Sequence, residues 1–94
     1  MDRKAFIDKL TTQLREWDAE IDKLEAKAQK AKADVKVEYN QQVQELKQKR
    51  DAAQNRLAEA IKAGDEAWDE LKSGADKAFD EMKFALEAAI SRFK

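Results

Sequence analysis

The strongest constraint on the fold of this 94-residue chain is the regular spacing of its apolar residues. From Ile7 to Val35 an apolar side chain recurs in alternating steps of three and four, the heptad pattern of a helix that packs along one seam. A run of this length predicts a helix over residues 7–35. The seam consists of Ile7, Leu10, Leu14, Trp17, Ile21, Leu24, Ala28, Ala31 and Val35.

Beyond Val35 the spacing changes. Two four-residue steps, through Tyr39 and Val43, make residues 35–46 a stutter that locally unwinds a supercoil. Over residues 57–93 a spacing of 11 dominates, which gives a nearly straight apolar stripe because eleven residues fill three turns. Residues 1–94 are therefore interpreted as a single helical coiled-coil domain with a heptad part (7–35), a stutter (35–46) and a hendecad part (57–93). The 11-residue series include Leu46, Leu57, Trp68, Phe79 and Ile90, and Leu71, Met82 and Phe93.

The chain has no proline, so the ends of its helices are predicted from weaker signals. Gly64 can end a helix in the left-handed conformation, and Asp65 can cap the next helix. We therefore predict an all-α fold, an elongated antiparallel hairpin with a long helix of about 2–63 and a shorter helix of about 65–93. Ser73-Gly74 is another candidate break, although the 11-residue repeat continues through it. A single continuous coiled-coil rod and a three-helix bundle divided near residues 34 and 64 are the alternatives.

This hairpin predicts self-association, because the shorter helix covers less than half of the longer one. The seam from Ile7 to about Leu24 would be exposed, and a continuous exposed apolar stripe indicates an interface. We expect a homodimer or homotrimer. The residues expected in the oligomer or core seam are Ile7, Leu10, Leu14, Trp17, Ile21, Leu24, Val35, Leu46, Leu57, Trp68, Leu71, Phe79, Met82, Leu86, Ile90 and Phe93.

The composition argues against catalysis. The chain has no Cys and no His, so it lacks thiolate nucleophiles and the commonest general base and metal ligand. Four carboxylates, at Asp65, Glu66, Asp69 and Glu70, could share a helix face and bind a hard cation, but a solvated helix start explains them better because the helix dipole favours anions there. We expect no enzyme activity, no catalytic residues, no cofactor and no metal.

The charges do not favour nucleic acid or membrane as a partner. The chain carries 19 basic and 20 acidic residues, and its most basic stretch is interleaved with acids, which is typical of a solvated face. Residues 64–94 carry a net charge of -3, the wrong sign for anionic lipid. The N-terminal region is charged throughout, so we expect a cytoplasmic protein. The basic stretch comprises Lys47, Lys49, Arg50 and Arg56.

Three segments give the chain a resemblance to a known family. The runs 14–22 (LREWDAEID) and 67–74 (AWDELKSG), with the ending Ser91-Arg92-Phe93, resemble a family of small bacterial coiled-coil proteins. Some of these are described as stress-response proteins. The resemblance implies a bacterial cytoplasmic protein without catalytic residues, and the family has no settled mechanism.

The function predicted from these features is that of a non-catalytic structural or interaction protein. It would be a homo-oligomeric coiled-coil scaffold, an adaptor or an assembly factor for a larger protein, and the family resemblance implies a link to stress. The alternative is a stress-protective amphipathic helical protein that acts on membranes or on unfolding clients.

Overall fold

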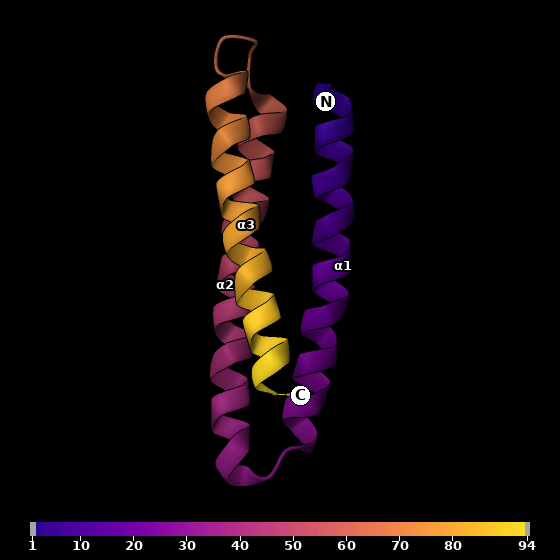
Figure 1. Cartoon of the computed structure of the whole chain (residues 1–94), viewed down its shortest axis with the longest axis vertical. Helices are drawn as coiled ribbons and strands as arrows, with labels where there is room; N and C mark the ends of the chain where they lie inside the picture. The colour runs from indigo at the N-terminus through magenta and orange to yellow at the C-terminus, as the bar shows by residue number, and fades with distance from the viewer. Residues whose placement is uncertain (1, 94) are drawn as a thin grey trace.

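A computed structural model describes residues 2–93 of the chain, which form three α-helices and no strand. Helix α1 spans Arg3–Lys30, α2 spans Ala33–Lys62 and α3 spans Trp68–Arg92. In Figure 1 α1 runs downward from the N-terminus, α2 returns upward and α3 runs downward again, along a rod of 51 × 18 × 17 Å. The all-α prediction is confirmed, and the arrangement is the three-helix alternative. Residues 1 and 94 of the predicted domain lie outside the described residues.

The predicted long helix of 2–63 is wrong, as is the continuous rod, because the chain turns at Ala31 and Lys32. Both residues are extended, with ψ values of 155° and 154°. The turn costs a few helical hydrogen bonds, each contributing roughly 0.5–1.5 kcal/mol. It lets α2 and α3 cover the seam of α1. Burying each large apolar side chain of the seam stabilises the fold by about 1.5–3 kcal/mol. Burial therefore outweighs the loss of helix.

The end of α2 lies near the predicted position, but Gly64 and Asp65 do not have the predicted roles. Among residues 2–93 no glycine has a positive φ, and the residue capping α3 is Ala67 rather than Asp65. The last carbonyls of α2 are satisfied by Arg3 instead, whose guanidinium donates to Ala60 and Ile61 at 3.2 Å each and also to Ala63. Since these carbonyls have a partner, no left-handed glycine is required. Helix α3 continues through Gly74, so no break occurs at Ser73-Gly74.

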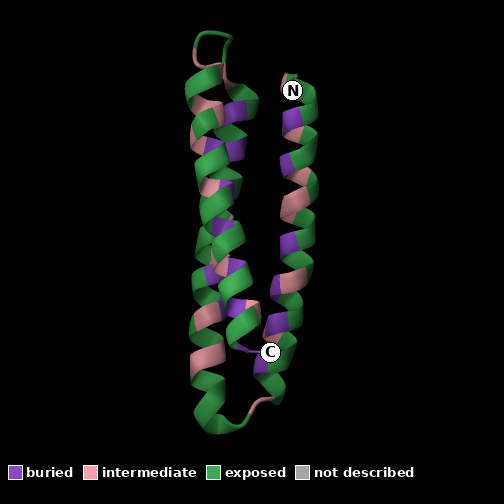
Figure 2. Ribbon diagram, viewed as in Figure 1, coloured by how far each residue is buried: buried purple, intermediate pink, exposed green. Residues whose placement is uncertain are grey.

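The core is one apolar cluster along the inward faces of the three helices (Figure 2). Fifteen of the sixteen seam residues lie in this interior or at its edge. Ten are buried, namely Leu10, Trp17, Ile21, Leu24, Leu46, Leu57, Phe79, Met82, Leu86 and Phe93. Five are partly buried, namely Ile7, Leu14, Trp68, Leu71 and Ile90. The seam of α1 is thus covered within one chain, which removes the reason given above for self-association.

Val35 is the exception among the seam residues, with 38% of its surface exposed. It continues the 11-residue stripe of Leu46 and Leu57, but α3 ends before reaching it. The ring of Phe93 stacks on Tyr39 with centroids 3.9 Å apart, and the Tyr39 hydroxyl donates to the Phe93 carbonyl at 3.1 Å. The part of the core that α3 covers therefore ends at Tyr39, about one helical turn short of Val35. The α1–α2 hairpin therefore extends beyond the end of α3 (Figure 1).

Candidate interaction surfaces

The interior of the described chain is apolar throughout. No polar or charged residue within 2–93 is buried, and no buried side-chain nitrogen or oxygen in this range lacks a hydrogen-bond partner. A catalytic acid or base is usually held in a desolvated pocket that shifts its pKa. Four surface features of the described chain are candidates for binding a partner.

The first surface is a groove of about 440 Å³ between α1 and α3. These two helices run in the same direction and pack less closely on each other than either packs on α2 (Figure 1). Large aromatic side chains bridge them, with ring centroids of Trp17 and Phe79 5.2 Å apart and those of Phe6 and Trp68 5.6 Å apart. The groove is lined by Gln13, Glu16, Trp17 and Glu20 of α1 and by Lys83, Leu86, Glu87 and Ile90 of α3.

The α1–α3 groove therefore combines an apolar floor with an acidic rim. Trp17 and Leu86 lie at the floor with 8% and 5% of their surfaces exposed, and Ile90 is partly buried beside them. The rim carries three glutamates and one lysine. This pattern fits the apolar face of an amphipathic helix with basic flanking residues.

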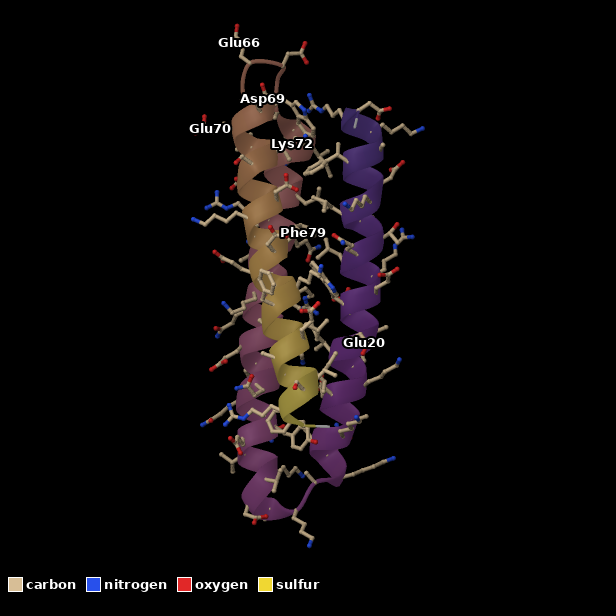
Figure 3. All side chains as sticks on the ribbon, in the orientation of Figure 1. Glu20, Glu66, Asp69, Glu70, Lys72 and Phe79 are labelled. Atoms are coloured by element: carbon tan, nitrogen blue, oxygen red, sulfur yellow. The ribbon has the colours of Figure 1, made fainter. Side chains whose placement is uncertain are left out.

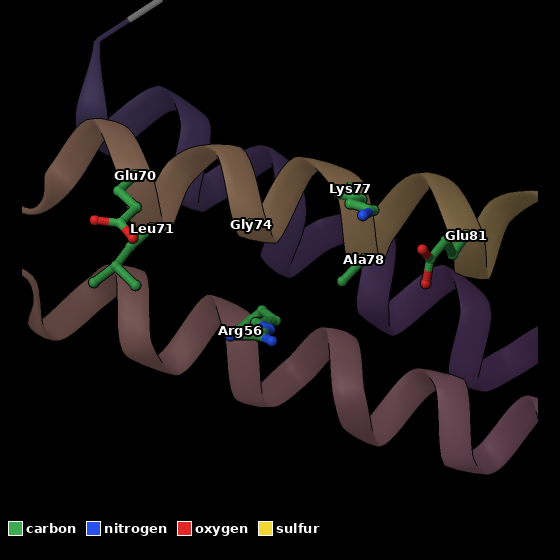
Figure 4. A pocket seen from close by; sticks show the side chains of 7 residues that line it. All are labelled: Arg56, Glu70, Leu71, Gly74, Lys77, Ala78 and Glu81. Atoms are coloured by element: carbon green, nitrogen blue, oxygen red, sulfur yellow. The ribbon is translucent and has the colours of Figure 1, made fainter.

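The second surface is a hollow of about 410 Å³ between α2 and α3 (Figure 4). Gly74 lies at its centre and contributes no side chain, so the hollow is a gap in the packing of the two helices. Two cations and two carboxylates surround it, so it has no net charge that would select a ligand. The lining residues are Arg56, Glu70, Leu71, Gly74, Lys77, Ala78 and Glu81.

The third surface is the acidic end of the rod, at the α2–α3 connection. Glu66, Asp69 and Glu70 lie there and point outward (Figure 3). Asp69 and Glu70 occupy the first turn of α3, as the helix-dipole argument predicts. Asp65 is fully exposed and lies 3.8 Å from Arg3. Within residues 2–93 no three carboxylates converge in a geometry that could hold a metal ion.

The fourth surface is the basic stretch of α2, where the structure pairs most of the cations with acids. Lys47 lies 2.9 Å from Glu25 of α1, and Arg56 lies 3.3 Å from Glu59. Arg50 bridges Asp51 at 3.0 Å and Asp18 of α1 at 3.2 Å.

The contacts of Arg50 with Asp51 and Asp18 also affect its pKa. The pKa of Arg50 is raised above its ordinary value, mainly by the hydrogen bond with Asp51; burial, the next largest effect, opposes this, and the hydrogen bond with Asp18 and the charges of both carboxylates raise it further. Lys47 and Arg50 pair across to α1 and Arg56 pairs within α2, which agrees with the interpretation of the stretch as a solvated face rather than a phosphate-binding one.

The sequence analysis missed one further surface, the end of the α1–α2 hairpin. Four lysines and two exposed valines gather there, and we refer to residues 27–37 as the hairpin tip. The segment KAQKAKADVKV (27–37) carries a visible excess of lysine, but only the turn at residues 31–32 brings these side chains to one end of the rod. The sequence analysis also omitted Phe6 and several core alanines, whose close packing depends on the crossing of the helices.

Comparisons with known proteins do not place the chain in a family. No family model matches it, no curated protein matches it and no solved structure matches it. Among the described residues, no helix is both long enough and apolar enough to cross a membrane.

Proposed function

We propose that the chain is a non-catalytic interaction protein, a helical rod that serves as a scaffold or adaptor through the groove between α1 and α3. The observation that carries this proposal is the composition of the groove. An apolar floor formed by Trp17, Leu86 and Ile90 lies between rims that carry Glu16, Glu20 and Glu87. A helix laid along the groove would place its apolar residues on the floor and its basic residues against the rims.

The rod itself suits such a role. Its three helices share one continuous apolar core, so the surface can hold a partner without rearranging the interior. The groove lies between two helices that both pack against α2, which favours a preformed binding surface. A rigid binding surface costs less entropy on association than a flexible one.

The proposed occupant is either the helix of a larger protein or a second copy of this chain in a homodimer or homotrimer. Self-association on the heptad seam would require the bundle to open, since α2 and α3 already cover that seam. A groove outside the core avoids this requirement. The family resemblance of the sequence supports a bacterial, cytoplasmic and stress-linked setting for the same proposal.

Site-specific photocrosslinking in cells tests the proposal. A photoreactive amino acid is placed at Gln13, which lines the groove, and in a control at Gln48, an exposed glutamine of α2. We expect a discrete crosslinked product at position 13 that is absent at position 48. A product of twice the chain mass identifies a second copy, and any other mass identifies a different protein.

The same crosslinking experiment is repeated with variants in which the charge of the groove rim is reversed. In the variant Glu16→Lys/Glu20→Lys, the product from position 13 should disappear, because the rim then repels basic residues. The control Glu45→Lys/Glu59→Lys makes the same change of charge on exposed positions of α2. Absence of a product at position 13, or a product that survives reversal of the rim, would contradict the proposal.

A further inference from the structure

The hairpin tip projects from the bundle without a third helix beside it. On the α2 side, Arg92 at the end of α3 pairs with Glu38, and Phe93 stacks on Tyr39. Residues 33–37 precede these contacts, so they lie beyond the point at which α3 ends (Figure 1). The tip is therefore surrounded by solvent on the side that α3 covers elsewhere.

The tip combines exposed apolar side chains with unpaired positive charge. Val35 is 38% exposed and Val37 is 62% exposed, two of the four large apolar residues exposed within residues 2–93. Lys27, Lys30, Lys32 and Lys36 are all exposed, and none of the ion pairs formed within residues 2–93 includes any of them.

The charge of the tip is opposite to that of the rest of the molecule. Residues 27–37 contain four lysines and one aspartate, giving a net charge of +3 within a chain whose total is -1. The carboxylates of Glu66, Asp69 and Glu70 lie at the far end of the rod, which is 51 Å long (Figure 3). An anionic surface would attract one end of the rod and repel the carboxylates of the other.

We propose that the hairpin tip docks the rod end-on to an anionic lipid membrane. The lysines contact the lipid headgroups, and Val35 and Val37, exposed in the first turns of α2, add apolar contacts at the headgroup boundary. Lysine suits this position because its aliphatic stem follows the valines inward while its ammonium group stays at headgroup level. The binding requires no unfolding, since the apolar face of α3 remains in the core with Phe79 and Met82 buried.

The residues of the tip favour lipid over nucleic acid. Proteins that bind nucleic acid usually rely on arginine for bidentate contacts and on aromatic rings for stacking. The segment 27–37 contains neither. A phosphate backbone would leave the two exposed valines without apolar contacts, whereas a membrane has an apolar layer below its charged headgroups.

This docking is independent of the proposed groove function. The net charge of -3 that disfavours anionic lipid belongs to residues 64–94, whereas the hairpin tip, residues 27–37, carries +3. Flotation of the full chain with vesicles tests it. Vesicles of phosphatidylcholine alone are compared with vesicles containing about 30% phosphatidylserine, at about 0.05 and about 0.5 M salt. We expect binding to the anionic vesicles at low salt only, with the helix content unchanged by circular dichroism.

Two variants locate the binding surface. Lys30→Gln/Lys32→Gln/Lys36→Gln should weaken binding roughly 100-fold, because each lysine near the surface contributes about a factor of five. The control Lys4→Gln/Lys9→Gln/Lys62→Gln removes the same charge from exposed positions outside the groove and should retain most of the binding. Val35→Ser/Val37→Ser should weaken binding roughly 10-fold at constant charge.

Several results would overturn the proposal. It fails if the chain does not float with anionic vesicles at low salt, or if it binds neutral vesicles equally well. It also fails if the lysine and control variants lose the same amount of binding. Heparin serves as a soluble polyanion for comparison. If the wild-type chain binds vesicles and heparin with equal affinity, and the valine substitutions do not weaken vesicle binding, the tip is a general polyanion site. The assignment to lipid would then be wrong.

Discussion

The indole ring of Trp17 and the phenyl ring of Phe79 lie with their centroids 5.2 Å apart and tilted by 41°, which joins α1 to α3 across the side of the bundle where these helices pack least closely. Both residues are almost fully buried. Together with the pair of Phe6 and Trp68, this pair provides aromatic packing between the two helices on that side. The groove proposed as the binding surface has Trp17 in its floor, so the same pair also shapes the groove.

Replacing Phe79 by alanine should therefore lower the free energy of unfolding by about 3–5 kcal/mol, as expected for a buried phenylalanine that leaves a cavity. Urea denaturation followed by circular dichroism measures the change. The matched control is Phe84→Ala in the same helix, where the ring is 65% exposed and the cost should stay below about 0.5 kcal/mol. Equal losses at the two positions would contradict the packing described above.

Gly74 offers a substitution that should stabilise the protein. It lies within α3, its φ is not positive, and a Cβ added there would have no atom within 4 Å. Gly74→Ala should therefore raise the free energy of unfolding by about 0.5–1 kcal/mol, because alanine loses less backbone entropy in a helix. The melting temperature should rise by a few degrees in a chain of this size.

The neighbouring residue supplies the control for this prediction. Ala75 faces the core and is fully buried, so Ala75→Gly should destabilise the protein by at least about 1 kcal/mol through both entropy and lost packing. A lower melting temperature for Gly74→Ala would contradict the open space found around this position.

The helical periods identify which residues face inward, but they do not determine where the chain turns. Trp17, Leu46 and Met82 could be assigned to the interior because a 3.5- or 3.67-residue period fixes the buried side of a helix. The turn at Ala31 and Lys32 carries no proline, glycine or capping side chain. It arises mainly because folding back buries the seam, which is a tertiary effect. The local signal, the poorer helix propensity of residues 34–37, supported only the three-helix alternative.

The candidate surfaces depend on that same turn. The groove joins Trp17 to Leu86, residues 69 positions apart, and becomes visible only when α1 and α3 are known to be neighbours. The hairpin tip is a lysine-rich run in the sequence, yet within one long helix these lysines would lie on several faces at its middle. Gly64 was correctly placed near a helix end, but Arg3, 61 residues away, supplies the cap that glycine was expected to provide.

Arg3 should consequently stabilise the far end of α2. Its guanidinium donates to three carbonyls at the end of that helix and lies 4.5 Å from the centroid of the Trp68 ring. Arg3→Ala should lower the free energy of unfolding by about 1–2 kcal/mol. This loss is smaller than that expected for a fully buried charged donor, because the Arg3 side chain is one-third exposed. Chemical denaturation of the variant measures this loss.

Arg15→Ala is the control for Arg3, since Arg15 lies on the same helix, is exposed and takes part in no ion pair within the described residues. Its cost should stay within about 0.5 kcal/mol. Amide hydrogen exchange provides a second readout, because the Arg3 variant should speed exchange in the last turn of α2 while the Arg15 variant leaves it unchanged.

The stability of the fold should not depend on pH around neutrality. Arg50 links α2 to α1 through Asp18, and its pKa is raised above the ordinary value, first by the hydrogen bond with Asp51 and then by the one with Asp18. A raised pKa in the folded state means that the stabilisation is complete below the unfolded pKa and is lost only as the pH rises through the folded value. That window lies far above neutral pH, because arginine titrates above about pH 12.

The chain also has no His and no Cys, the side chains whose ordinary pKa values are nearest to neutrality. We therefore expect the melting temperature, followed by circular dichroism, to agree within about 3 °C between about pH 6 and about pH 9. Asp18→Asn should lower the melting temperature slightly, and by the same amount at about pH 6 and about pH 9. The ion pair with Arg50 that it removes is partly exposed and contributes at most about 1 kcal/mol. A melting temperature that falls steeply between these pH values would mean that a carboxylate or lysine with a strongly shifted pKa takes part in the core, contrary to the entirely apolar interior of residues 2–93.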